Sequence, residues 1–127
     1  MSKRPPLPRS ELEVARIVWE LQGATVRQVL EALPKERDLD FKTVQTYLRR
    51  LKAKGYLRTR RDGRSHVYLA CVRPSRVVRA VVEDLVDRLF GGQALPLVQH
   101  LIEDRGLSDA ELDQLQGILN RLKESKR

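Results

Sequence analysis

Apolar residues recur at helical spacing in three segments of the first half of the chain. The segments are residues 12–19, 26–33 and 44–51, and in each of them apolar side chains return every three or four positions. This spacing places the side chains on one face of a helix, so each segment predicts an amphipathic helix. Gly23 and Pro34 follow the first two segments and are expected to end those helices.

Residues that can cap a helix stand before each of these segments. Ser10 and Thr25 open Ser-x-x-Glu and Thr-x-x-Gln sequences, which predict capping boxes. Asp40 precedes the third segment, and its carboxylate can accept hydrogen bonds from the free N–H groups of a first turn. Gly55 follows that segment, at the place where a left-handed residue would end the helix. A third helix is therefore predicted between Asp40 and Gly55.

The pattern changes from helical to extended after Gly55. Residues 56–61 and 64–70 favour β-strands, and Asp62-Gly63 lies between them. An Asp-Gly pair favours a tight turn in which both central residues have positive φ, so a hairpin that turns at these two residues is predicted. Three helices followed by a hairpin predict a winged helix-turn-helix domain over residues 9–72, with the hairpin as its wing.

Three further helices are predicted in the second half of the chain. Residues 77–90 carry paired apolar side chains at helical spacing, residues 95–102 form a shorter apolar set, and residues 112–122 follow Ser108, which opens another capping box. Three helices of this length cannot bury so many Leu and Val side chains by themselves. They could pack on the first domain, but their balanced charge beside a basic half favours pairing with a second copy.

The predicted fold is therefore mainly α with a small β-hairpin. It consists of an N-terminal winged helix-turn-helix domain plus a C-terminal three-helix dimerisation domain at residues 73–127. Residues 1–8 contain three prolines and two basic side chains and are predicted to be a flexible basic arm. The residues predicted to form dimer contacts are Val78, Val81, Val82, Leu85, Leu89, Leu101, Leu112, Leu115 and Leu119.

The net charge of +8 is unevenly distributed. Residues 1–70 contain 16 Lys and Arg against 8 Asp and Glu, whereas residues 71–127 contain nine of each. Excess positive charge favours a polyanionic partner, either nucleic acid or an anionic membrane. The predicted hairpin tip, Arg61-Asp62-Gly63-Arg64, lacks the apolar side chains that a membrane contact needs. We therefore expect double-stranded DNA as the partner and no membrane contact.

The polar side of the third predicted helix combines cations with Thr and Gln. Cations neutralise phosphates, and Thr and Gln can hydrogen-bond to base edges, with Gln able to pair bidentately with adenine. A solvated amphipathic helix would show the same pattern, so the prediction depends on the charge distribution and on the hairpin that follows. The predicted DNA-binding residues of this helix are Lys42, Thr43, Gln45, Thr46, Arg49 and Arg50, and the predicted phosphate contacts of the wing are Arg58, Arg60, Arg61 and Arg64.

No catalytic or metal-binding arrangement is indicated by the sequence. Cys71 is the only cysteine, which excludes an intrachain disulfide and favours a reducing compartment. His66 and His100 share no further ligand at metal-binding spacing. We expect no enzymatic activity, no metal and no cofactor. Because the sequence shows neither an apolar leader nor a membrane-spanning run, a cytoplasmic location is expected.

Two other functions stay open at this point. Winged helices also serve as protein-binding modules, so an adaptor for an acidic partner is one alternative. A regulator that holds a small ligand between its domains is the other, although no residue names such a ligand. Salt-dependent and sequence-selective retention of a DNA duplex would separate DNA binding from the adaptor.

Several motifs resemble those of one family of regulators. They are Leu7-Pro8-Arg9-Ser10-Glu11-Leu12-Glu13-Val14, then Lys42-Thr43-Val44-Gln45-Thr46 with Leu51-x-x-Lys54-Gly55-Tyr56-Leu57, then Gly91-Gly92, and finally Leu107-Ser108-x-x-Glu111-Leu112. In this order and spacing, from about Leu7 to Leu122, they resemble the penicillinase-repressor (BlaI/MecI/CopY) family of bacterial transcriptional regulators.

The resemblance implies a homodimeric winged-helix repressor that binds a palindromic operator and whose C-terminal helices interlock between subunits. It also implies groove-facing roles for residues 42–46 and phosphate contacts for Arg49 and Arg50. In the family, proteolysis between Asn and an aromatic residue relieves repression of β-lactam-resistance genes. The aligned positions here are His100 and Leu101, so the resemblance carries neither that cleavage nor a β-lactam role over to this chain.

The copper-responsive branch of the family carries a C-terminal cysteine cluster. This chain has only Cys71, so copper sensing is not expected. A sensor or protease that acts on the C-terminal helices is not named by any residue of the sequence.

Overall fold

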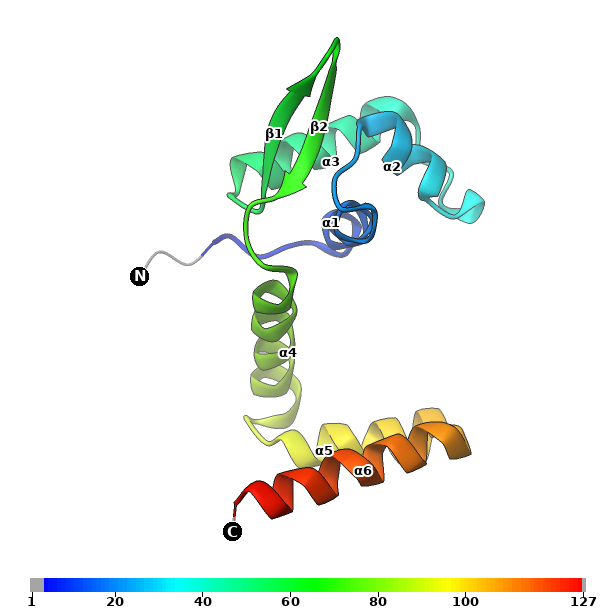
Figure 1. Ribbon diagram of the computed structural model, residues 1–127, viewed down its shortest axis with the longest axis vertical. Helices are drawn as coiled ribbons and strands as arrows, with labels where there is room; N and C mark the ends of the chain where they lie inside the picture. The colour runs from blue at the N-terminus through cyan, green and yellow to red at the C-terminus, as the bar shows by residue number, and fades with distance from the viewer. Residues whose placement is uncertain (1–3, 127) are drawn as a thin grey trace. The chain divides into compact units, whose positions relative to one another are not determined.

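A computed structural model describes residues 4–126 of the chain (Figure 1). The chain divides into two compact units, Met1–Val78 and Arg79–Arg127. The elements of the first unit are α1 (Arg9–Leu21), α2 (Val26–Ala32), the 3-10 helix η1 (Lys35–Arg37), α3 (Phe41–Ala53), β1 (Leu57–Asp62) and β2 (Ser65–Ala70). Helix α4 (Pro74–Phe90) begins in this unit and ends in the next.

The first unit is a three-helix core with a two-stranded antiparallel hairpin, which confirms the predicted winged-helix class. Apolar faces of α1, α2 and α3 meet in a core that Tyr56, Leu57 and Tyr68 extend toward the hairpin. The side chains that form its fully buried centre are Val14, Val18, Val29, Val44, Leu48, Leu51 and Leu57. The stripe predicted on the third helix is therefore the one that packs.

Both ends of α3 are fixed by the residues that the sequence marked. The carboxylate of Asp40 accepts a 2.8 Å hydrogen bond from the backbone N–H of Thr43. At the other end Gly55 has φ +87°, and the N–H of Tyr56 donates to the carbonyl of Leu51 at 2.9 Å. The N–H of Gly55 also donates to the carbonyl of Lys52 at 3.1 Å, and the two bonds form a Schellman motif, which satisfies carbonyls that the helix itself leaves free. The predicted capping boxes at Thr25 and Ser108 are also present.

The predicted capping box at Ser10 is wrong. Helix α1 begins at Arg9 with Pro8 as its N-cap, and no side chain caps it. The carbonyl of Pro8 accepts from the N–H of Leu12 at 3.0 Å, so the helix is already under way at Ser10. Proline has a fixed φ and no N–H group that would need an acceptor, which suits it to a helix start.

The position predicted for the hairpin turn is also wrong. Asp62 pairs with Ser65, so the two central residues of the turn are Gly63 and Arg64. Gly63 has φ +63°, whereas Arg64 does not have a positive φ. This is the pattern of a type II′ turn, which requires glycine only at the first central position. The pairing of Asp62 with Ser65 thus places the turn one residue later than the Asp-Gly pair predicts.

A backbone bridge ties the hairpin to the connection between α1 and α2. The N–H of Ala24 donates to the carbonyl of Tyr68 at 3.0 Å, and the N–H of Tyr68 donates to the carbonyl of Ala24 at 2.8 Å. Gly23 precedes this bridge with φ +116°, and a Cβ atom there would lie 2.7 Å from Cδ2 of Leu69. The glycine thus permits the close approach that holds the wing beside the helices.

The described part of the predicted N-terminal arm makes hydrogen bonds with the end of α3. The guanidinium of Arg4 donates to the carbonyl of Gly55 at 3.0 Å, and the hydroxyl of Tyr56 donates to the carbonyl of Pro5 at 2.6 Å. A segment rich in proline has few N–H groups, so it is held here largely through its carbonyls. Residues 1–3 of the predicted arm lie outside the described residues.

The second unit consists of the end of α4, α5 (Ala94–Gln99), the π-helix η2 (His100–Gly106) and α6 (Asp109–Ser125). Val86, which is 8% exposed, is the one buried apolar side chain among the described residues of this unit. Eight of the nine predicted dimerisation residues have exposed side chains, and Leu115 is partly buried. Among the described residues, no helix has the length and apolar character needed to cross a bilayer.

Candidate nucleic-acid interface

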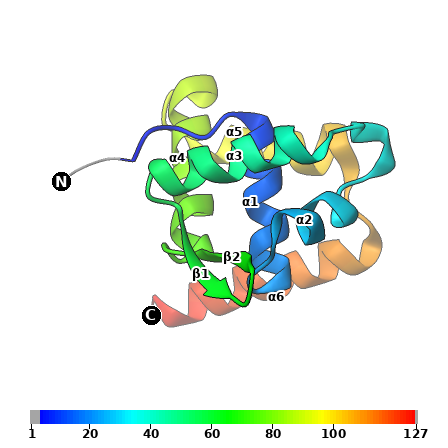
Figure 2. The same ribbon diagram turned by 90° about the horizontal axis from the view of Figure 1, so that it is seen from above.

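An open groove lies in the first unit between α3, the hairpin and the start of α2. Figure 2 shows α3 on one side of this region and the hairpin and α2 on the other. The residues that line the groove are Thr25, Val26, Arg27, Phe41, Gln45, Arg49, Lys52, Ala53, Thr59, Arg64, Ser65, His66 and Tyr68. Three separate elements therefore contribute to one concave surface.

The groove lining is strongly positive. Arg27, Arg49, Lys52 and Arg64 supply four cations, and the residues that line the groove include no Asp or Glu. The four cations come from α2, α3 and the turn of the hairpin. A concave surface with charges of one sign attracts a ligand of the opposite sign more strongly than scattered charges do.

Helix α3 presents one stripe of its polar side to this groove. Phe41, Gln45, Arg49 and Lys52 follow one another at spacings of four, four and three residues, which places them on one face. Gln45 and Arg49 were predicted as DNA contacts, and the groove brings them together. The other predicted residues of this helix are not among those that line the groove, and they are Lys42, Thr43, Thr46 and Arg50.

Two of these other residues have hydroxyl groups engaged within the helix. The hydroxyl of Thr46 donates to the carbonyl of Lys42 at 3.0 Å. The hydroxyl and the backbone N–H of Thr43 together hold the pKa of Asp40 below its ordinary value. Lys42 and Arg50 have exposed side chains. The part of α3 outside the groove therefore offers cations, and its two threonines also stabilise the helix.

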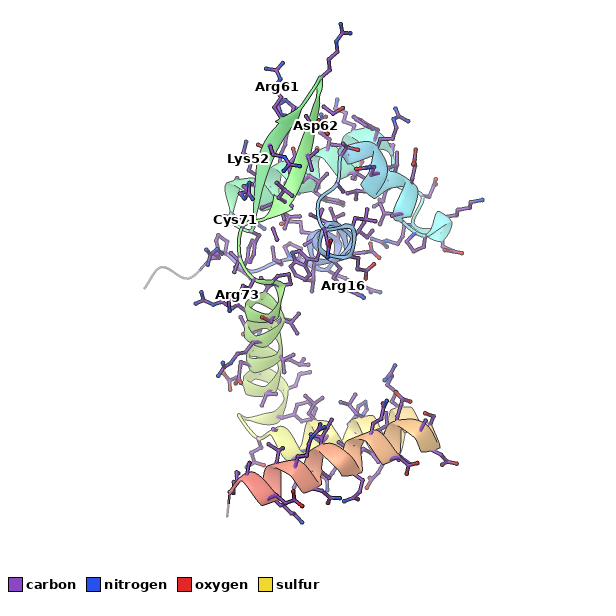
Figure 3. All side chains as sticks on the ribbon, viewed as in Figure 1. Arg16, Lys52, Arg61, Asp62, Cys71 and Arg73 are labelled. Atoms are coloured by element: carbon purple, nitrogen blue, oxygen red, sulfur yellow. The ribbon has the colours of Figure 1, made fainter. Side chains whose placement is uncertain are left out.

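The hairpin sorts its arginines onto two faces. Thr59 lines the groove, and Arg61 lies two residues further along β1, so both lie on the same face of the strand. The residues opposite them on β2 are Tyr68 and His66, which also line the groove. Arg58 and Arg60 alternate with these residues and face the other side. Figure 3 shows Arg61 projecting from the hairpin near its tip and Lys52 on α3.

Arg27, Phe41 and Lys52 were not among the predicted site residues. Lys52 could have been found from its spacing of seven residues from Gln45. Arg27 could have been found from its place in the first turn of α2, because the start of the first helix of a helix-turn-helix lies near the DNA backbone. Phe41 carried no such indication, since an apolar residue at a helix start is usually assigned to the core.

His66 and Cys71 belong to no cluster of metal-binding side chains among the described residues. His66 lines the groove from β2, and Cys71 is exposed just after that strand. Among the described residues, no three or more His, Cys, Asp and Glu side chains are grouped so that they could hold a metal ion.

Residues 7–121 match the family model described as penicillinase repressor. The chain belongs to the penicillinase repressor family. A penicillinase repressor of Bacillus licheniformis is 30% identical over 127 residues, which are all of this chain and 99% of that protein. The methicillin resistance regulatory protein MecI of Mammaliicoccus sciuri is 28% identical and covers 88% of this chain, which in turn covers 91% of that protein. The family resemblance of the sequence is thus confirmed over nearly the whole length.

Two solved structures of the repressor BlaI match 59% of this chain. The DNA-binding domain of the repressor BlaI is 35% identical, with a TM-score of 0.51, and covers 59% of this chain and 92% of that domain. The same identity and coverages, with a TM-score of 0.50, are found for Bacillus licheniformis BlaI in its monomeric form in complex with the blaP half-operator. A MarR-family protein of Bacillus stearothermophilus, 16% identical with a TM-score of 0.56, shares the fold.

Proposed function

We propose that this member of the penicillinase repressor family is a sequence-specific double-stranded DNA-binding transcriptional repressor that acts as a homodimer on a palindromic operator in the cytoplasm. The observation that carries the proposal is the groove, which gathers Arg27, Arg49, Lys52 and Arg64 and contains no carboxylate among its lining residues. BlaI, which is 35% identical in its DNA-binding domain, has been solved with a half-operator, and this supports DNA as the ligand.

The cations supply most of the affinity in this mechanism. Each Lys or Arg that neutralises a phosphate releases counterions, so binding should weaken steeply as salt is added. Arg27 and Lys52 contact the DNA backbone from the two sides of the groove. Arg61 and Arg64 contact it from the wing. These contacts fix the register of the protein on the duplex without specifying its sequence.

Sequence selectivity comes from α3. The side chain of Gln45 lies in the groove and offers both an amide donor and an acceptor, which match the N7 and N6 groups of adenine. Lys42, Thr43 and Thr46 extend the contact along the N-terminal half of the helix, which is the part of a recognition helix that reaches base edges. Arg49 and Arg50 follow on the next turn, nearer the phosphates.

The second unit supports the proposal of a homodimer. Its described residues contain only one buried apolar side chain, Val86, while Leu89 is 68% exposed and Leu122 is 52% exposed. Exposed apolar surface on several helices marks a surface that another molecule covers. A two-fold pair of chains would present two copies of α3 to an inverted repeat. Linking two binding domains also raises the effective concentration of the second, so a signal that separates the pair would relieve repression.

Selection of duplexes from a random pool tests the proposal directly. The wild-type protein should enrich an inverted repeat, and its affinity should fall steeply with added salt. Gln45→Ala should weaken binding to the selected duplex by about 1–3 kcal/mol and relax selectivity at one position of each half-site. Gln93→Ala, an exposed glutamine outside the first unit, is the matched control and should bind as the wild type does.

Two outcomes would contradict the proposal. A protein that enriches no duplex, or that binds all duplexes equally at every salt concentration, would favour the protein-interaction adaptor. A Gln45→Ala variant with unchanged selectivity would remove Gln45 from base recognition while leaving DNA binding in place.

A further inference from the structure

Phe41 is an aromatic side chain that the core does not use. It is the first residue of α3 and is 41% exposed. It is neither one of the buried core residues nor one of the apolar residues packed against them. It instead lines the basic groove, where most of the other residues are polar or charged. An exposed apolar residue is ordinary by itself, but this one is placed in the candidate DNA interface.

The ring of Phe41 is held by a contact from another helix. The Cζ atom of Arg27, on α2, lies 5.7 Å from the ring centroid and over its face. A guanidinium at this distance is attracted by the negative face of an aromatic ring. The contact fixes the ring in the groove and leaves part of its apolar surface uncovered. It also holds the guanidinium of Arg27 at the N-terminal end of α2, where its N–H groups can donate to a phosphate.

Phe41 also lies next to the residue proposed to recognise adenine. Phe41 and Gln45 are four residues apart on α3, so their side chains are neighbours on the same face of the helix. A phenylalanine has no group that can hydrogen-bond to a base. The apolar group that B-DNA presents in its major groove is the C5-methyl of thymine.

We propose that Phe41 is a specificity-determining residue that packs against the C5-methyl group of a thymine in each half-site, beside the base pair contacted by Gln45. Arg27 is the positioning residue that holds the ring by its cation–π contact. The proposal rests on the proposed function, because it requires α3 to enter the major groove. It adds a base contact that depends on apolar packing and not on hydrogen bonding.

Replacement of single thymines by deoxyuridine tests the proposal, because the two bases differ only in the C5-methyl group. The probe is the duplex selected by the wild-type protein, with thymines replaced one at a time in both half-sites. At one position of each half-site, a single replacement should lower the wild-type affinity roughly threefold to fivefold, the effect of removing one methyl group from an apolar contact. Phe41→Ala should bind the thymine and deoxyuridine duplexes equally at that position and keep the wild-type pattern elsewhere.

Two further variants make the test independent of a single substitution. Leu21→Ala removes an apolar side chain that is 47% exposed and does not line the groove, so it should keep the full deoxyuridine pattern. Phe41→Gln keeps a long side chain at the helix start and should lose the methyl dependence as Phe41→Ala does. It serves where the alanine variant does not fold, which circular dichroism would show.

The outcomes separate the two proposals. Selective and salt-dependent binding, with equal affinities for thymine and deoxyuridine at every position, would overturn the role of Phe41 alone. The same would follow from Phe41 variants that keep the wild-type deoxyuridine pattern. A wild-type protein that selects no duplex would overturn the proposed function, and the role of Phe41 with it.

Discussion

Lys54 and Glu11 form a partly buried ion pair between the end of α3 and the first turn of α1, with 2.6 Å between Nζ and Oε1. The side chain of Glu11 is 4% exposed and that of Lys54 is 22% exposed. A carboxylate removed from water to this degree is stable only while its partner is present. The pair therefore fixes how α3, which carries the candidate DNA contacts, sits on α1.

Removing one member of this pair should be costly. We expect Lys54→Met to lower the free energy of unfolding by about 3 kcal/mol, because Glu11 is left buried and unpaired. The double variant Glu11→Leu with Lys54→Met should be more stable than Lys54→Met alone. Urea unfolding measures both. Arg16→Met breaks an exposed pair with Glu20 and should cost less than about 0.5 kcal/mol. Equal losses for Lys54→Met and Arg16→Met would show that burial adds nothing.

Gly23→Ala should lower the free energy of unfolding of the chain, because it strains the segment that holds the wing beside the helices. The residue has φ +116°, and the added Cβ would lie 2.7 Å from the Leu69 side chain. Leu69 can move aside, but the backbone strain stays, so we expect a loss of about 1–3 kcal/mol. Thermal unfolding measures it. Gly117→Ala is the opposite case, because this glycine lies within α6 with open space around it and should gain up to about 1 kcal/mol. A neutral Gly23→Ala would mean that the bridge between Ala24 and Tyr68 tolerates a shift.

Acid should weaken the chain partly through Asp40. Hydrogen bonding from Thr43, by its hydroxyl first and then its backbone N–H, holds the pKa of Asp40 below the ordinary value of 3.8. A carboxyl with a lowered folded-state pKa contributes stability above its unfolded pKa and loses it as the pH falls through the folded value. Asp40→Asn keeps a capping acceptor but cannot titrate, so its stability should fall less steeply below about pH 4. Identical pH profiles by urea unfolding would rule out this contribution.

Arg61 and Arg60 give a matched pair on the two faces of one strand. Arg61 shares the groove face with Thr59, and Arg60 faces the other way. Arg61→Ala should weaken binding to all duplexes alike and lower the slope of log affinity against log salt by about one unit. Arg60→Ala should lower that slope by less. Equal slopes for the two variants would contradict the proposed orientation of the wing on the backbone.

Leu119→Asp should produce monomers. Leu119 is 44% exposed on α6, and a carboxylate placed in an apolar interface would be unpaired and removed from water. Asn120→Asp adds the same charge at the next position, which already carries a polar side chain, and should leave the dimer intact. Sedimentation of both variants and the wild type measures the mass. A monomeric wild type at micromolar concentration would remove the dimer from the proposed mechanism.

Local features of the sequence were enough to predict the helices, most of their caps and the presence of the hairpin. Asp40, Thr25 and Ser108 each act within one turn of their own position, so neighbouring residues determine their roles. The spacing of Val44, Leu48 and Leu51 likewise identifies the buried face without reference to the rest of the chain.

The features that sequence patterns missed depend on residues far apart in the chain. Lys54 meets Glu11 across 43 positions, and Arg27 meets Phe41 across the α2–α3 connection. Neither contact follows from periodicity, because each requires the packing of whole helices. The turn at Gly63 was misplaced for a related reason, since its position depends on pairing along both strands. The cations of α3 could be predicted as exposed, but not which of them share a groove with the wing.

The arginines of the hairpin also affect how the protein behaves in concentrated solution. The sheet has the order β1–β2, so β1 is an edge strand whose free backbone groups could pair with another molecule. Arg58, Arg60 and Arg61 place three positive charges along that edge, and like charges oppose such pairing. Neutralising all three together should therefore promote edge-to-edge aggregation. Charge-reversed variants, which stay soluble, are the better choice for studying loss of DNA binding.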